Sequence, residues 1–116
     1  MADGVVTFAE LKDAMRRFVA ERDWQPFHSP KNLAMGLACE AAELMEHFLW
    51  MDLPASYQAA ADPVAKEAIA DELADVANYV LCMSLALDID LSDAIVRKMG
   101  KNAQKYPVEK FKGKYK

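Results

Sequence analysis

The chain has 116 residues, of which 53% are apolar and 28% are charged, and its formal net charge is -4. This length fits a single domain, and the apolar content excludes an intrinsically disordered chain. No apolar run reaches the roughly 20 residues that span a membrane, and the first residues lack the pattern of a secretion signal. We therefore expect one cytoplasmic domain over residues 1–116, with a core of about 7–107 and a basic tail at 108–116.

The charge is unevenly distributed along the chain. Residues 97–116 hold eight Lys or Arg residues and a single acid, Glu109, so the rest of the chain is strongly acidic. This asymmetry indicates a cation site in the body and an anionic partner near the tail, although a solvated lysine tail is the alternative. A nucleic acid polymer is not an expected partner, because the acidic body would repel its phosphates.

Two helices are expected in the first half of the chain, because alanine is much commoner than the β-branched residues. The first begins after Thr7, whose hydroxyl can cap it, and runs to about Asp23. A loop with two prolines follows. The second helix runs from Pro30, with Ser29 as its N-cap, to about Met51.

A third helix follows a connector over residues 54–62, in which a short helical turn is expected around Ser56–Ala60. Asp62 is the predicted N-cap and Pro63 the first helical residue. Apolar residues at helical spacing continue from there to about Leu87. The second and third helices are the longest, and we expect them to be antiparallel.

The fourth predicted helix is capped by Ser92 and ends near Tyr106, where Pro107 stops it. The chain is therefore expected to be all-α, with four helices in a bundle-like arrangement. So much apolar helix surface is hard to cover in a chain of this length. We therefore also expect a homo-oligomer, either a dimer or a tetramer.

Two pairs of acids mark the middle of the two long helices. Glu40 and Glu43 are three residues apart and share a helix face, as do Glu72 and Asp75. Like charges at this spacing repel and cost stability unless a cation lies between them. Four carboxylates without a partnered histidine suit Mg²⁺ or Mn²⁺ better than zinc. The alternative interpretation is a set of surface charges on amphipathic helices.

The fourth helix offers a complement to such a metal. Lys98, Asn102 and Lys105 share one face, and Tyr106 follows at the helix end. Magnesium bound by carboxylates recruits substrate phosphates, and lysines with an amide can clamp a polyphosphate. An ordinary polar helix face is the alternative.

Aromatic residues near both acid pairs suggest a nucleobase as the remaining part of the ligand. Trp24 and His28 lie in the loop before the second helix, Trp50 lies ten residues after Glu40, and Tyr79 lies one turn after Asp75. Aromatic side chains beside a phosphate site can stack on a base. Core packing is the alternative explanation.

The combined pattern resembles a known family. An ExxE pair followed by an ExxD pair, here Glu40–Glu43 and Glu72–Asp75, resembles the MazG-type all-α nucleoside triphosphate pyrophosphohydrolases. The flanking positions over about residues 7–107 look like the dCTP pyrophosphatase branch. They are Glu21-Arg22-Asp23-Trp24, Phe27-His28, Pro30-Lys31-Asn32-Leu33, Trp50, Tyr79, Lys98-Met99, Asn102 and Tyr106-Pro107.

The resemblance implies Mg²⁺-dependent hydrolysis of a (deoxy)nucleoside triphosphate, dCTP or a modified dCTP, to the monophosphate and pyrophosphate. It implies a role in nucleotide pool housecleaning, and a homo-oligomer with sites near subunit interfaces. By position, the metal ligands would be Glu40, Glu43, Glu72 and Asp75. From its place inside this group of acids, Glu43 is the candidate catalytic base. Substrate would contact Trp24, His28, Lys31, Asn32, Trp50, Tyr79, Lys98, Asn102, Lys105 and Tyr106.

One departure from the branch leaves the base preference open. Members that prefer cytosine can carry a histidine on the first helix where this chain has Met15, and a thioether cannot donate a hydrogen bond to a base. Three other hypotheses remain. They are a non-catalytic nucleotide-binding oligomerisation module, a purely structural helical bundle, and the same fold acting on another substrate such as dUTP or a phosphoribosyl-ATP intermediate.

Overall fold

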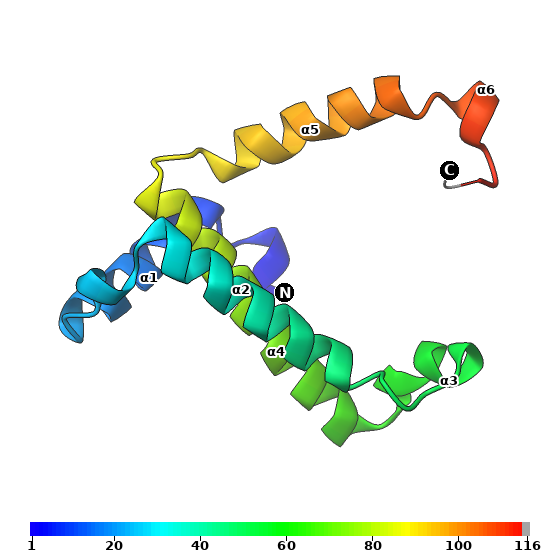
Figure 1. Cartoon of the computed structure of the whole chain (residues 1–116), viewed down its shortest axis with the longest axis horizontal. Coiled ribbons are helices and arrows are strands. Elements are labelled where there is room, and N and C mark those ends of the chain that lie inside the picture. The colour runs from blue at the N-terminus through cyan, green and yellow to red at the C-terminus, as the bar shows by residue number, and fades with distance from the viewer. Residues whose placement is uncertain (115–116) are drawn as a thin grey trace.

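The computed structural model describes residues 1–114, and every regular element in that range is helical (Figure 1). The α-helices are α1 (Phe8–Glu21), α2 (Pro30–Glu46), α3 (Leu53–Tyr57), α4 (Pro63–Ala86), α5 (Leu91–Lys105) and α6 (Val108–Phe111). Short 3-10 turns lie at Ala2–Gly4, Gln25–Phe27 and Ala59–Ala61. The all-α prediction is therefore confirmed. Within the described residues, none of the helices has both the length and the apolar character needed to cross a membrane.

Three helices begin where the capping residues predict. The Thr7 hydroxyl accepts a hydrogen bond from the Glu10 amide at 3.2 Å, and the Ser29 hydroxyl accepts one from the Asn32 amide at 3.1 Å. The Asp62 carboxylate does the same for the Ala65 amide at 3.2 Å. Each bond satisfies an amide that the first turn of a helix leaves without a partner.

The predicted end of the second helix, at about Met51, is wrong. Helix α2 ends at Glu46 and is followed by turns and then by α3, which Asp52 caps by accepting a hydrogen bond from the Ala55 amide at 2.8 Å. An N-cap residue needs extended backbone, and Asp52 has φ -79° and ψ 174°. The chain must therefore leave the helical path before Asp52.

The predicted cap of the last long helix is also wrong. Asp90, and not Ser92, caps α5, by accepting a hydrogen bond from the Asp93 amide at 2.9 Å. Helix α5 consequently begins at Leu91. Helix α6 lies within the predicted basic tail, of which residues 115 and 116 fall outside the described range.

The body is formed by α1, α2 and α4. Helices α2 and α4 lie side by side and run in opposite directions, as predicted, and α1 packs against α4 (Figure 1). The buried apolar residues are contributed by these helices; they are Val19, Leu33, Leu81 and Cys82. Helix α5 leaves this body at the turn after α4 and extends away from it (Figure 1). It leaves Ile95, Val96 and Met99 exposed.

Gly36 sets the distance between α2 and α4. A Cβ atom built on Gly36 would lie 2.6 Å from Cζ of Tyr79, well inside van der Waals contact. The missing side chain therefore makes the space in which the Tyr79 ring lies against α2. This contact is on the same helix interface as the predicted acid pairs.

We expect Gly36→Ala to lower the free energy of unfolding by about 1–3 kcal/mol, the range typical of overpacking, although alanine is the better helix former. Gly100→Ala in α5 is the matched control, because nothing lies within 4 Å of its added Cβ. The control should gain up to about 1 kcal/mol. Denaturant unfolding measures both, and equal stabilisation by the two substitutions would contradict the close contact.

Candidate functional site

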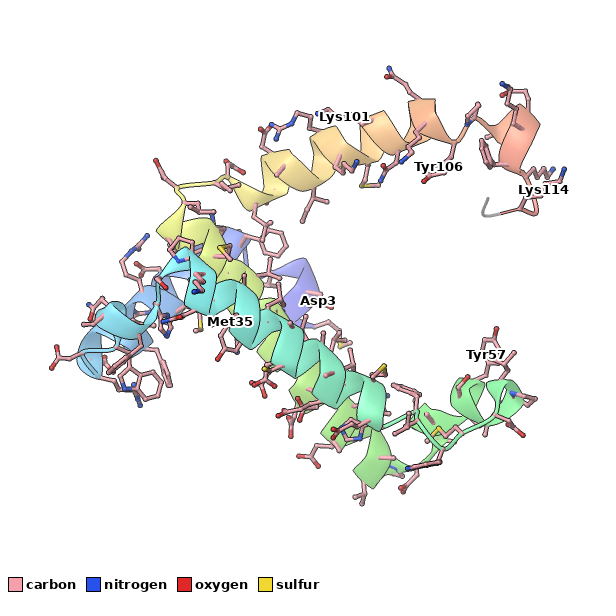
Figure 2. The ribbon with its side chains drawn as sticks, viewed as in Figure 1. Asp3, Met35, Tyr57, Lys101, Tyr106 and Lys114 are labelled. Atoms are coloured by element: carbon pink, nitrogen blue, oxygen red, sulfur yellow. The ribbon has the colours of Figure 1, made fainter. Side chains whose placement is uncertain are left out.

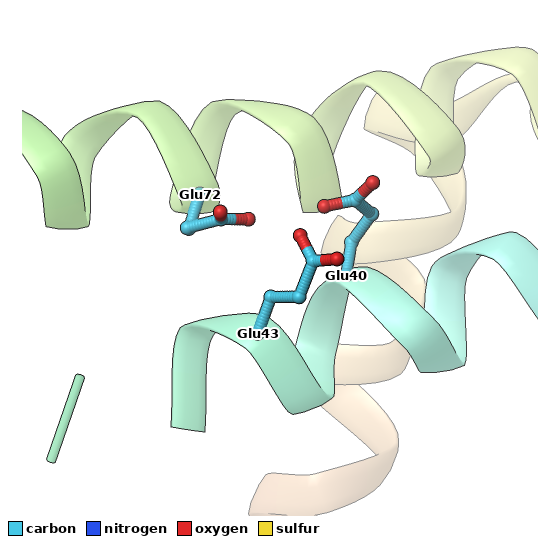
Figure 3. A group of neighbouring side chains, drawn as sticks. All are labelled: Glu40, Glu43 and Glu72. Atoms are coloured by element: carbon cyan, nitrogen blue, oxygen red, sulfur yellow. The ribbon is translucent and has the colours of Figure 1, made fainter. Parts of the chain in front are cut away.

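Three of the predicted metal ligands meet between α2 and α4. Glu40 and Glu43 project from one face of α2, and Glu72 faces them from α4 (Figure 3). Carboxylate oxygens of the three residues all lie within 4.8 Å of one another. We call Glu40, Glu43 and Glu72 the carboxylate cluster. Asp75 lies outside this group, three residues further along α4.

The electrostatics of the carboxylate cluster are unfavourable without a cation. One oxygen each of Glu40 and Glu72 is buried and has no hydrogen-bond partner. The pKa of Glu40 is raised from its ordinary value of 4.5 to about 7. Desolvation is the largest cause, and the adjoining carboxyls of Glu43 and Glu72 and the negative charge of Asp75 contribute the rest.

No basic side chain relieves this repulsion within residues 1–114. The ion pairs in that range are Arg16–Asp13, Arg17–Asp13, Arg22–Glu21 and Arg97–Asp93, and none of them involves the carboxylate cluster. Buried carboxylate oxygens without a partner are the hard ligands that Mg²⁺ and Mn²⁺ prefer. The donor set therefore fits such a divalent cation.

A pocket of about 330 Å³ adjoins the carboxylate cluster, and we call it the main pocket. Its lining comes from α1, the loop before α2, α2 itself and α4: Met15, Phe18, Val19, Trp24, His28, Glu40, Asp75, Asn78, Tyr79 and Cys82. Glu40 belongs both to this lining and to the carboxylate cluster. The volume is at the lower end of the range for pockets that hold small molecules.

One wall of the main pocket is aromatic. The rings of Phe18 and Trp24 meet edge to face, with centroids 5.7 Å apart. The Arg22 guanidinium lies 3.7 Å from the centroid of Phe18, which helps to fix that ring. The face of a flat aromatic ligand such as a nucleobase can lie against such a wall.

A second pocket, of about 260 Å³, lies further along α4. It shares Val19, His28 and Cys82 with the main pocket and adds Arg16, Gln25, Leu85 and Ala86. The two pockets therefore follow the same helix from the carboxylates towards its carboxyl end. Burial in this apolar floor raises the pKa of the Cys82 thiol.

Five predicted site residues thus lie together in the main pocket, together with Met15, the position at which this chain departs from the branch. They are Trp24, His28, Glu40, Asp75 and Tyr79.

Other predicted substrate residues lie elsewhere in the single chain. The Asn32 side chain donates a hydrogen bond to the Phe27 carbonyl at 3.2 Å, which holds the loop before α2. Lys31 is exposed on the first turn of α2, and Trp50 is 92% exposed beyond the end of that helix. None of the three lines the main pocket.

The predicted phosphate-binding residues of α5 are also separate from the carboxylate cluster. They are Lys98, Asn102, Lys105 and Tyr106, and none lines the main pocket. Figure 2 shows Lys101 on α5 and Tyr106 just after its carboxyl end, apart from the α2 and α4 pair. The Tyr106 ring instead packs edge to face on Phe111, with centroids 5.2 Å apart.

Sequence reasoning missed four residues of the main pocket: Phe18, Val19, Asn78 and Cys82. The three apolar ones were indistinguishable from core residues. Asn78 carried a signal that could have been used, because it lies three residues after Asp75 and therefore on the same helix face.

Known proteins resemble this chain over most of its length. The sequence profile of the MazG-like family matches residues 37–116. The dCTP pyrophosphatase 1 of Mus musculus is 36% identical over 107 residues, and that of Homo sapiens is 34% identical over 101 residues. These alignments cover 92% and 87% of this chain, but 63% and 59% of the two relatives. The chain thus spans less than two thirds of their length.

A solved structure shares the fold. The crystal structure of a pyrophosphatase from Archaeoglobus fulgidus matches with a TM-score of 0.79 and 37% sequence identity. The match covers 85% of this chain and 91% of that chain. Together, these similarities confirm the resemblance that the motif spacing predicted.

The raised pKa of Glu40 generates a prediction about stability. Between 4.5 and about 7 the folded protein binds more protons than the unfolded chain. The stability of the metal-free protein should therefore fall as pH rises through that window. We expect melting temperatures in EDTA to decrease from pH 5 to pH 8, and Glu40→Gln to reduce this dependence.

Glu67→Gln is the control for that measurement, because Glu67 is an exposed glutamate of the same helix as Glu72. It should leave the pH dependence as in the original chain. Added Mg²⁺ should restore stability mainly at the high-pH end, where Glu40 has lost its proton. A flat profile in EDTA would show that folding does not raise the pKa of Glu40.

Proposed function

Because this chain belongs to the MazG-like family, we propose that it hydrolyses a (deoxy)nucleoside triphosphate to the monophosphate and pyrophosphate. The observation that carries this proposal is the position of Glu40, which joins the carboxylate cluster to an aromatic-walled pocket. A triphosphate needs both parts, a cation site for its phosphates and a flat cavity for its base. We propose dCTP or a base-modified dCTP as the first candidate substrate, on the ground that the mouse and human relatives are named dCTP pyrophosphatases.

Glu40, Glu43 and Glu72 would hold Mg²⁺, with Asp75 beside them. When bound, the ion would neutralise negative charge on the phosphate oxygens and so favour attack by water. The chain's own residues would do the rest. Phe18 and Trp24 would hold the base, so that the phosphates extend along α4 towards the carboxylates.

Glu43 is the proposed general base. It is the exposed member of the carboxylate cluster, whereas Glu40 and Glu72 each bury an oxygen. Its carboxylate would take a proton from the attacking water as the new P–O bond forms. The bond between the α-phosphorus and the bridging oxygen, or that between this oxygen and the β-phosphorus, then breaks. Either cleavage gives the monophosphate and pyrophosphate.

The test is pyrophosphate release from a panel of dNTPs, NTPs and 5-methyl-dCTP, with and without Mg²⁺. We expect metal-dependent release by the original chain, and a loss of about 10²–10⁴-fold in turnover for Glu43→Gln with nucleotide binding retained. Glu46→Gln, one turn further along α2, is the control and should keep its activity.

The outcomes separate the hypotheses. Pyrophosphate release from dUTP alone would support the proposed hydrolysis and show that dUTP, and not dCTP, is the substrate. Absence of release from every triphosphate, with nucleotide binding intact, would favour a non-catalytic binding module. Near-normal turnover of Glu43→Gln would show that a group other than Glu43 acts as the general base.

We also propose a homo-oligomer in which α5 of one copy serves the carboxylate cluster of another. Within one chain α5 extends away from the body, and its lysines and Asn102 do not reach the main pocket. Its exposed Ile95, Val96 and Met99 are apolar residues that a second copy could cover. The exposed Trp50 is a further candidate for that interface. We also propose that the protein is cytoplasmic.

Complementation between two inactive variants tests the shared site. We expect Glu72→Gln and Lys98→Ala each to be inactive alone, whereas coexpression should recover roughly a quarter of the original turnover, as statistical mixing of a twofold dimer gives. Coexpression of Glu72→Gln with Glu40→Gln is the control, since both defects lie in one carboxylate cluster, and it should recover nothing. Mixed oligomers verified by mass that stay inactive in the first pair would contradict the sharing of α5.

A further inference from the structure

Asn78 is a polar residue that the fold itself does not use. It is half-buried in the lining of the main pocket, and its side chain makes no hydrogen bond within residues 1–114. It also lies in the interior of α4, a helix of 24 residues. Asparagine is a poor helix former, because its amide competes for backbone hydrogen bonds. A position that is unfavourable for the helix, and whose amide has no partner within the described residues, leaves that amide available to a ligand in the pocket.

The position of Asn78 along α4 relates it to the carboxylate cluster. It follows Asp75 by three residues and Glu72 by six, which places it about 9 Å along the helix axis from Glu72. Asp75, Asn78 and Cys82 all line the main pocket. A nucleotide whose phosphates lie at the carboxylates would therefore extend its sugar and base towards Asn78.

The chemistry of the remaining lining explains why an amide matters here. The wall around the base would consist of Met15, Phe18, Val19 and Cys82, together with Trp24 and His28. The Trp24 indole can only donate, and a neutral His28 imidazole has its donor and its acceptor on two nitrogens that face in different directions. The Tyr79 ring is fixed against Gly36. A carboxamide presents a donor and an acceptor side by side, which is the pattern along the hydrogen-bonding edge of a nucleobase.

We propose that Asn78 is a specificity-determining residue that hydrogen-bonds the edge of the substrate's nucleobase. This inference rests on the proposed function, because it assumes a nucleotide with its phosphates at the carboxylate cluster. A site built to hydrogen-bond its substrate rejects analogues that lack the matching group, since its own polar atoms are then left unpaired. Asn78 would thus supply the polar contact that Met15 cannot.

The first test compares the preferred triphosphate with deoxyribose 5-triphosphate, which has no base. Asn78→Ala should lower kcat/KM for the preferred nucleotide at least tenfold, yet leave kcat/KM for the base-free compound and the midpoint of the Mg²⁺ titration unchanged. Its melting temperature should stay the same or rise, because alanine favours the helix. Glu67→Gln, exposed on the same helix, is the control and should change none of these quantities.

Two results would overturn the inference. An equal loss for the nucleotide and the base-free compound would make Asn78 a residue that positions the helix or the phosphates. An unchanged kcat/KM for both compounds would show that Asn78 does not contact the substrate. Asn78→Asp, which keeps the shape and the acceptor but loses the donor, should change the preference among bases; an unaltered preference would also count against base reading.

A second measurement keeps this inference separate from the proposed hydrolysis. The affinity for nucleoside 5′-monophosphates in the presence of Mg²⁺, measured by calorimetry, needs no turnover. Asn78→Ala should weaken binding of the preferred monophosphate at least tenfold and leave that of ribose 5-phosphate unchanged. Absence of pyrophosphate release by the original chain would defeat the proposed function, whereas an unchanged monophosphate affinity would defeat the role of Asn78.

Discussion

The mutual repulsion of Glu40, Glu43 and Glu72 is the constraint on which the rest of the site depends. Their oxygens lie within 4.8 Å of one another, and two of these oxygens are buried without a partner. Helices α2 and α4 are held together at this distance by packing elsewhere on the same interface, where Leu33 is buried and Tyr79 lies against Gly36. Apolar contact thus offsets the electrostatic cost of bringing the carboxylates together, and a bound cation would remove that cost.

The main pocket follows from the same helix pair. Helix α1 packs on α4 beyond the carboxylates, and the loop with Trp24 and His28 closes the space between them. One helix, α4, therefore carries an acidic residue of the carboxylate cluster and part of the polar and apolar lining of the main pocket. Because a helix is rigid over this length, the separation between the two halves of the site is fixed. Such a fixed spacing is suited to a ligand with a charged end and a flat end.

The sequence predicted features that depend on residues close together in the chain, such as helix caps. It did not predict all of the helix ends, nor the direction in which α5 leaves the body. The caps at Thr7, Ser29 and Asp62 are correct because each bond joins residues three apart. The predicted start of α5 was wrong because Asp90, and not Ser92, is the cap. The predicted end of α2 was wrong because apolar residues continue at helical spacing to Phe48, whereas the backbone forms turns after Glu46. Helical spacing predicted the carboxylate pairs. It could not give the direction of α5, which the turn after α4 determines, nor tell pocket-lining apolar residues from core.

The direction of α5 gives the charge asymmetry of the chain a structural meaning. The basic segment that starts at Arg97 extends away from the acidic body, so its lysines do not neutralise the carboxylates of their own chain (Figure 1). If α5 folded back onto the carboxylate cluster, lysines would compete with the cation for the same oxygens. Separation within the chain keeps those oxygens available. In the proposed oligomer a second copy would then bring positive charge to the phosphates of the substrate, on the side that the metal does not occupy.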